Sequence, residues 1–235
     1  MNIEKYSYDI SEKQKCWYKS ICDGTKCGEK FCIRHYKMSC LTYMACMEGN
    51  LKYPIQLRLD SARTDQAAFY RLKEIQNNIN TFVGSGKNLL IYSANTGNGK
   101  TEWSKKLLLS WFNSIWSTTD FECRGLFVSL PKLMSAMKEN ITKPNEYYQY
   151  VNDNIVNADL VVWDEINYKD YSGYEHDYLL NIISERLALG KSNIYTTNYT
   201  LDVINVKLGS RLASRIIGQS EKIEFCSNDK RGLNI

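Results

Sequence analysis

The sequence lacks any long apolar run, and this absence argues against a membrane protein. No stretch approaches the roughly 18 apolar residues that a membrane-spanning helix needs. The N-terminal stretch "MNIEKYSYDISEKQK" is polar and has no apolar segment of the kind found in signal peptides. We therefore expect a cytoplasmic protein, whose thiols stay reduced. Its eight cysteines then need an explanation other than disulfide bonds.

Proline and glycine are scarce, and we find no internal repeat or low-complexity tract. Domain boundaries must therefore come from changes in pattern. Six of the eight cysteines lie between Cys16 and Cys46, and an apolar helical stripe begins near Asp65. We expect a cysteine-rich module at residues 1–50, a linker at 51–64 and the main domain at 65–235. The net charge of +4 permits contact with nucleic acid but does not argue for it alone.

The main domain alternates apolar strands with helices. Strands that are apolar along their whole length are typical of a parallel sheet with helices on both faces. The predicted fold class is therefore α/β. We expect strands at 88–93, 124–130, 159–166, 192–198 and 222–225, and helices within 65–83, 100–116, 131–140, 145–158, 174–190 and 210–217.

A phosphate-binding loop is predicted between the first strand and the helix that follows it. In such a loop, backbone N–H groups surround a phosphate at the positive end of the helix. The lysine reaches the β- and γ-phosphates, and the next hydroxyl binds Mg²⁺. ATP and Mg²⁺ are therefore the expected ligands. The loop residues are Ala94, Asn95, Thr96, Gly97, Asn98, Gly99, Lys100 and Thr101.

Ala94 stands where such loops usually have their first glycine. If this position has negative φ, alanine adds only a methyl group. If it requires positive φ, the strain is about 1 kcal/mol. Neither case abolishes binding, so we expect the loop to function.

Polar residues end two of the later strands. Asp164 and Glu165 follow four apolar residues, and Asn198 ends the strand "SNIYTTN". In P-loop ATPases, an aspartate at this place holds Mg²⁺, and the adjacent glutamate polarises the water that attacks the γ-phosphate. An amide at the neighbouring strand end contacts the γ-phosphate and that water, a role called sensor 1. These residues predict hydrolysis as well as binding.

Two arginines lie close to the end of the main domain. Arg211 and Arg215 are four residues apart in "GSRLASRIIG" and share one face of a predicted helix. Arginine can neutralise the charge that develops on a γ-phosphate bound to a neighbouring subunit. The alternative is a solvated basic stripe. His176, alone at a polar helix start, is expected to be incidental.

In this order and spacing, "ANTGNGKT", "VVWDEI", "TTN" and "RLASRI" resemble the AAA+ ATPases of the DnaC/IstB type, the bacterial and phage replicative-helicase loaders. The resemblance covers about residues 65–235. It implies a P-loop AAA+ core without a C-terminal helical lid, and assembly through an arginine finger acting in trans. Arg215 best matches that finger, and Arg211 comes second. Ala94 and Trp163 depart from the family pattern, and we expect Trp163 to have a packing role.

A zinc site is predicted in the cysteine-rich module. Zinc takes four thiolate or imidazole ligands, and a module with little core gains its fold from the metal. The expected Zn²⁺ ligands are Cys16, Cys22, Cys27 and Cys32. His35 is an alternative to Cys16 or Cys32, and a module without metal stays open. Some phage loader-like ATPases resemble this segment, since they also begin with "CWYKxIC". Buried thiols are expected at Cys40, Cys46, Cys123 and Cys226.

Basic and aromatic residues are interleaved through the same module, which suits single-stranded nucleic acid, a protein partner or an ordinary solvated surface. Together with the resemblance, these features predict ATP-dependent loading of a replicative DNA helicase onto single-stranded DNA. The alternatives are a transposition-helper ATPase of the same family, a nucleoside kinase, and a nucleotide-gated DNA-binding adaptor with little turnover. The residues around Arg211 and Arg215 have no role in a kinase, and Glu165 and Asn198 argue against the adaptor.

Overall fold

The computed structural model describes residues 32–47, 64–120, 122–166 and 170–228, and the structural statements below concern these ranges. The predicted zinc ligands Cys16, Cys22 and Cys27 lie outside them. In chain order the elements are α1 (Ile33–Met44), α2 (Gln66–Asn77), α3 (Ile79–Gly84), β1 (Asn88–Tyr92), α4 (Lys100–Ile115), β2 (Gly125–Ser129), α5 (Leu130–Thr142), α6 (Glu146–Asn154), β3 (Leu160–Asp164), α7 (Gly173–Ala188), β4 (Ser192–Thr197), α8 (Leu201–Gly218) and β5 (Ser220–Glu224).

The five strands form one parallel sheet in the order β2-β3-β4-β1-β5. Leu90 of β1 pairs with Tyr195 of β4 on one side and with Lys222 of β5 on the other. Because all strands run the same way, their carboxyl ends meet at one edge of the sheet. The predicted α/β class with a parallel sheet is confirmed.

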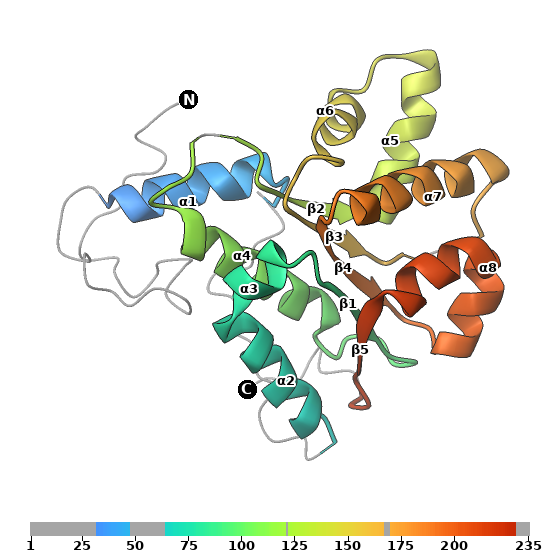
Figure 1. The fold of residues 1–235 in the computed structure, drawn as a ribbon. Coiled ribbons are helices and arrows are strands. Elements are labelled where there is room, and N and C mark those ends of the chain that lie inside the picture. Colours follow the sequence, from blue (N-terminus) through green and yellow to red (C-terminus); the bar gives the residue numbers. More distant parts are fainter. Residues whose placement is uncertain (1–31, 48–63, 121, 167–169, 229–235) are drawn as a thin grey trace.

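The two faces of the sheet carry two separate cores (Figure 1). Side chains alternate along a strand, so Leu89 and Ile91 join the core under α1–α4, whereas Leu90 joins the core under α5–α8. Burial on both faces explains why these strands read as continuous apolar runs. Trp163 is fully buried and its indole N–H donates to Asn193 Oδ1 at 3.0 Å, which is the packing role expected of it.

Arg186 stabilises the amino-terminal edge of the sheet, opposite the edge that carries the predicted site. Its side chain is fully buried, and its guanidinium donates to the carbonyl oxygens of Ile155, Ala158 and Ser192. Burial lowers the pKa of this guanidinium to about 10, and the carbonyls compensate for part of the lost hydration. The amino-terminal ends of β3 and β4 are thereby tied to α7.

Two helical segments differ from the sequence prediction. The stripe that begins near residue 65 forms two helices, because Asn78 leaves helical geometry with φ −111° and ψ 31°. The helix predicted at 210–217 is the second half of a longer α8, which is broken at Gly209 with φ 69° and ψ 156°. A residue with a Cβ would be strained at that φ, so Gly209 allows the break.

Residues 32–47 pack against the α/β core. Met38 and Leu41 share an apolar core with α4, and Phe127 of the edge strand β2 donates its N–H to Ala45 O at 2.8 Å. Arg34 also donates to Asn113 Oδ1 of α4 at 3.0 Å. The division of the chain at residues 50 and 64 stays a prediction, but residues 32–47, in the last third of the predicted cysteine-rich module, are in contact with the main domain.

The remaining cysteines meet the expectation of burial only in part. Cys40 is 1% exposed, as predicted, and Cys46 and Cys123 are half-buried. At Cys226 the prediction was wrong, because this thiol is exposed. Cys226 follows the last strand, where its backbone N–H is engaged with Asp65 while the side chain faces solvent.

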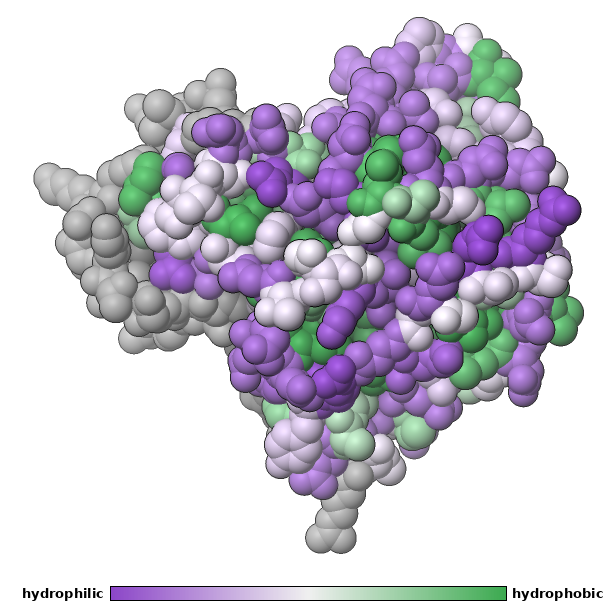
Figure 2. Space-filling model, in the orientation of Figure 1, coloured by the Kyte–Doolittle hydropathy of each residue, from purple (hydrophilic) through white to green (hydrophobic). Residues whose placement is uncertain are grey.

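Hydrophilic side chains predominate on the face shown in Figure 2, and apolar ones form small separate groups. Among the residues described, no helix is long and apolar enough to cross a membrane.

Candidate nucleotide-binding site

The predicted phosphate-binding loop connects β1 to α4, as expected. Gly97 has φ 68° and Gly99 has φ 100°, a conformation that L side chains rarely adopt. A Cβ on Gly99 would meet nothing within 4 Å, so its conformation, not space, requires glycine there. Ala94 is exposed and is not among the residues with positive φ. Alanine therefore introduces no backbone strain in place of the first glycine.

Lys100 is the first residue of α4, and its side chain lies against the loop. Its Nζ donates to the Asn95 carbonyl at 2.7 Å and to Asn98 Oδ1 at 2.9 Å. The residue is only 6% exposed, so these acceptors replace much of the hydration of the ammonium group. A positively charged group and the positive end of a 16-residue helix are thus presented at the same place, which favours an anion.

Asp164 ends β3 and is held by two threonine hydroxyls. Thr101 Oγ1 donates to Asp164 Oδ1 at 2.9 Å, and Thr196 Oγ1 of β4 donates to the same oxygen at 2.7 Å. Burial raises the pKa of Asp164, and the two hydroxyl hydrogen bonds oppose that rise. Neither hydrogen bond occupies Oδ2. The hydroxyl of Thr101 and the carboxylate of Asp164 are adjacent oxygen donors of the kind that Mg²⁺ prefers.

Glu165 follows directly, in an unusual backbone conformation. Its φ is 59°, a left-handed value that is uncommon for a residue other than glycine. Its N–H donates to Thr196 Oγ1 at 3.1 Å, which holds the residue in that conformation. Burial raises the pKa of the Glu165 carboxyl, and the charge of Asp164 adds to the rise. The turn separates the two acids, so Glu165 lines the pocket while Asp164 is buried beside Thr101.

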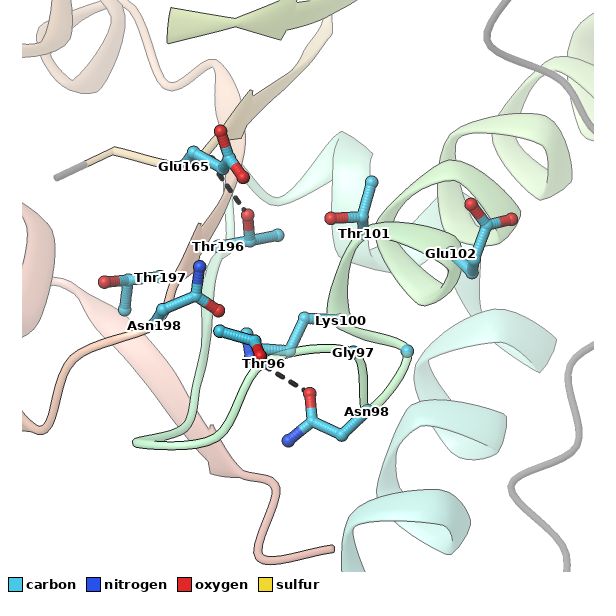
Figure 3. Close-up of a pocket in the computed structure, with 11 residues that line it drawn as sticks. Thr96, Gly97, Asn98, Lys100, Thr101, Glu102, Glu165, Thr196, Thr197 and Asn198 are labelled. Carbon is cyan, nitrogen blue, oxygen red and sulfur yellow. Dashed lines mark hydrogen bonds between the residues drawn. The ribbon is translucent and has the colours of Figure 1, made fainter. Parts of the chain in front are cut away.

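These residues surround one pocket of about 300 Å³ (Figure 3). The predicted residues Lys100, Thr101, Glu165 and Asn198 all line it, together with four residues of the loop. Asp164 lies behind Thr101, and Ala94 and Asn95 lie outside the lining. The pocket lining is Thr96, Gly97, Asn98, Gly99, Lys100, Thr101, Glu102, Glu165, Thr196, Thr197 and Asn198.

The structure does not bring the two arginines into this pocket. Arg211 and Arg215 are exposed and line a different hollow between α7 and α8, with Ser210 and Ser214 beside them. They share one face of the helix, as predicted from their spacing. Within one copy of the chain, the arginines and the phosphate-binding loop are therefore separate sites.

The zinc site stays a prediction, because three of its four cysteines lie outside the described residues. Cys32 is 7% exposed and is the N-cap residue of α1, where its Sγ accepts the N–H of His35 at 3.4 Å. His35 lies in the first turn of that helix and is half-buried. Within the described ranges, no three His, Cys, Asp or Glu side chains form a group that could hold a metal ion.

Two residues make contacts that the sequence did not indicate, one at this site and one at α8. Thr196 connects Asp164 to the backbone of Glu165, although "YTTN" drew attention only to its asparagine. His176 was expected to be incidental, but its Nε2 lies 2.9 Å from Leu208 O, immediately before the break in α8. A histidine 32 positions before its partner gives no local signal in the sequence.

Comparison with known proteins gives structural matches only. No protein-family model matches the sequence, and no curated protein matches it. Among solved structures, a DnaC helicase loader is 19% identical, with 73% of this chain and 95% of that chain covered and a TM-score of 0.59. DnaI is also 19% identical, with coverage of 75% and 88% and a TM-score of 0.55.

The replication initiator DnaA, bound to AMPPCP and single-stranded DNA, is 18% identical with a TM-score of 0.54. This match covers 70% of the present chain but 47% of the DnaA chain, so the chain spans about half of that protein. At these identities the likeness concerns the fold. The protein has the α/β fold of the AAA+ core of DnaC-like proteins.

Proposed function

We propose that this protein is an ATPase that loads a replicative DNA helicase onto single-stranded DNA. The observation that carries the proposal is the single pocket in which the phosphate-binding loop, Glu165 and Asn198 meet beside the buried Asp164–Thr101 pair. Fold and pocket support an ATPase of the AAA+ type. The likeness to a DnaC helicase loader supports the choice of helicase loading as its task.

ATP would place its phosphates at the loop and at the start of α4. Lys100 would contact phosphate oxygens from the place in which Asn98 Oδ1 and the Asn95 carbonyl hold it. Thr101 and Asp164 would hold Mg²⁺, which supplies neutralisation of the phosphate charge. Both residues are already positioned by their mutual hydrogen bond, so little rearrangement is needed there.

Glu165 is the proposed base for hydrolysis. It accepts a proton from the attacking water as the water oxygen bonds to the γ-phosphorus and the bond to the β-phosphate oxygen breaks. Asn198, at the end of β4, orients that water and the γ-phosphate by hydrogen bonding. Because Glu165 lines the pocket and Asp164 does not, the two adjacent acids divide the work between proton transfer and cation binding.

Arg215 is the proposed finger, with Arg211 as second choice. In their own chain both lie in the hollow between α7 and α8, apart from the nucleotide pocket. They would act on the nucleotide of a neighbouring copy, where an arginine neutralises charge in the transition state. Hydrolysis should therefore depend on protein concentration and on assembly.

The N-terminal segment is the proposed docking element for helicase or DNA. Cys16, Cys22, Cys27 and Cys32 would hold one zinc ion, with His35 as the alternative ligand. Cys32 begins a helix that is bonded to α4, the helix of the phosphate-binding loop. A partner held by this segment would thus lie on an element that is packed against the ATPase core.

Native mass spectrometry tests the proposal as a whole. The protein is mixed with the replicative helicase of the same organism or its host, with and without ATP, and the Lys100→Ala variant is the control for nucleotide binding. A helicase complex that changes with ATP only in the wild type, with one zinc per chain, supports the proposal. Absence of that complex, together with ATP-driven assembly on DNA, overturns helicase loading and favours the transposition helper.

A further inference from the structure

Asp65 is a buried carboxylate at the start of α2 that does not cap this helix with its side chain. It is the N-cap residue of α2, where an aspartate normally accepts an N–H of the first helical turn, yet it makes no such bond. It is only 2% exposed. Its Oδ1 instead accepts the backbone N–H of Cys226 at 2.7 Å, and both of its oxygens lie 3.3 Å from the N–H of Ser227. The carboxylate of Asp65 is thus hydrogen-bonded to the segment that follows β5.

The same segment is bonded to the phosphate-binding loop. Ser227 O accepts from Asn95 Nδ2 at 3.3 Å and from Asn98 Nδ2 at 3.4 Å. Asn98 is 1% exposed, and its Nδ2 also donates to Ser93 Oγ at 2.8 Å. The amide nitrogens of both asparagines therefore face the Ser227 side of the loop.

Lys100 lies on the opposite side of these two asparagines. Because the nitrogen of the Asn98 amide is engaged with Ser93 and Ser227, its Oδ1 faces the ammonium group of Lys100 at 2.9 Å. A flipped amide would direct its own N–H groups at a cation, which is unfavourable. The direction of this side chain, and with it the place of Lys100, thus depends on the hydroxyl of Ser93 and on the carbonyl of Ser227.

We propose that Asp65 is a positioning residue for the phosphate-binding loop. Asp65 accepts the N–H of Ser227, and the carbonyl of Ser227 accepts from Asn95 and Asn98. Through the backbone of Ser227 it fixes these two residues, which hold Lys100 in the place from which it reaches a nucleotide phosphate. The proposal deepens the proposed function, because it rests on ATP being the ligand of this loop. A preformed loop binds its ligand more tightly because less ordering is left to be done on binding. Asp65 should therefore affect nucleotide affinity and leave the chemical step unchanged.

The test compares Asp65→Ala, Asp65→Asn and Glu221→Gln. Asparagine keeps an oxygen acceptor, so it should restore part of what alanine removes. Glu221 of β5 pairs with Arg71 of α2 at 2.5 Å, so Glu221→Gln weakens a contact between the same two regions of the chain, away from the loop. The readouts are the Kd for a non-hydrolysable ATP analogue with Mg²⁺, kcat at saturating ATP, and the melting temperature.

Asp65→Ala should raise the Kd for the analogue about tenfold, because a charge-assisted hydrogen-bond acceptor is lost. Its kcat should stay near the wild-type value, and amide hydrogen exchange of residues 93–99 should become faster. Glu221→Gln should leave the Kd unchanged. An unchanged Kd in Asp65→Ala, or an equal loss in Glu221→Gln, overturns the inference. If the wild type itself does not bind the analogue, the proposed function fails instead.

Discussion

The candidate nucleotide pocket and the hollow between α7 and α8 both hold residues of the proposed reaction. They differ in whether those side chains are hydrogen-bonded within their own chain. Lys100, Thr101 and Asp164 are each held by hydrogen bonds from neighbouring elements of their own chain. Arg211 and Arg215 are exposed, and neither side chain makes a hydrogen bond or ion pair with any described residue. The side chains of the first site are held within one chain, whereas the arginines of the second have no partner among the residues that the structure describes.

This contrast separates binding from hydrolysis. Groups that are fixed before the ligand arrives need no ordering on binding, so one chain should suffice to bind ATP. Charge that develops in the transition state needs a further cation, which on the proposed mechanism the arginines of another copy would supply. Assembly would then control turnover without controlling nucleotide affinity.

Arg215→Ala should have the largest effect on turnover. An arginine finger contributes about 10³-fold or more to the rate, so the variant should lose most of its kcat while keeping its Kd for ATP. Arg211→Ala is the matched control on the same helix face, and it should lose less. Steady-state ATPase assays over a range of protein concentration measure both. Equal activity of wild type and Arg215→Ala would remove this residue from the reaction.

Glu165→Gln should lower kcat by about 10²-fold or more, because general base catalysis is worth that much. Binding of ATP should persist, since the loop is unchanged. Mixing this variant with Arg215→Ala is the sharper experiment. Some interfaces of a mixed assembly combine an intact Glu165 with an intact Arg215, so the mixture should be more active than either variant alone. Activity that is simply the average of the two would contradict action in trans.

His176 should have a smaller effect, through the direction of the arginine helix. Its Nε2 bonds the Leu208 carbonyl where Gly209 breaks α8, and Arg211 and Arg215 follow that break. His176→Leu removes the bond and should lower kcat several-fold with an unchanged Kd for ATP, as expected from the loss of one hydrogen bond. His176→Gln can still donate to the carbonyl and should retain more activity. A fall in nucleotide affinity would instead mean that His176 supports the candidate nucleotide pocket and not the arginine helix.

The sequence predicts the nucleotide pocket better than it predicts the contacts that support it. Asp164, Glu165 and Asn198 could be placed together because parallel strands bring their carboxyl ends to one edge. The bonds from Asp65 to Ser227 join residues 162 positions apart and use backbone N–H groups, which no side-chain pattern reveals. Of α8 only the second half was predicted, although Leu201, Ile204 and Leu208 of the first half have helical spacing and the last two are buried.

The N-terminal segment makes contacts that the sequence does not reveal. Cysteine spacing grouped residues 32–47 with the predicted module at 1–50, and that division stays a prediction. Met38 and Leu41 of the 12-residue helix α1 share an apolar core with α4, and the pattern of one helix does not identify a packing partner that is distant in the sequence.

The activity should also depend on pH through Glu165. Burial and the charge of Asp164 raise the pKa of this carboxyl above its ordinary value of 4.5, and only its charged form accepts a proton. The kcat should therefore fall as pH decreases through a pKa above 4.5. The folded state binds this proton more tightly than the unfolded state, so the group's contribution to stability is present at low pH and is lost as pH rises through the folded pKa. Glu165→Gln should remove this pH dependence from the melting temperature, measured from acidic to neutral pH.

Ala94→Gly should have the smallest effect, and it tests whether the first site is complete as it stands. Glycine is favoured at loop positions with positive φ, but Ala94 does not have one and its methyl group is exposed. The substitution therefore relieves no strain and only adds freedom to the unfolded chain and to the loop. The Kd for ATP should change less than about twofold, the equivalent of roughly 0.4 kcal/mol. A marked gain in affinity, measured by titration calorimetry, would mean that the loop is strained before ATP binds, and the contrast with the arginine hollow would weaken.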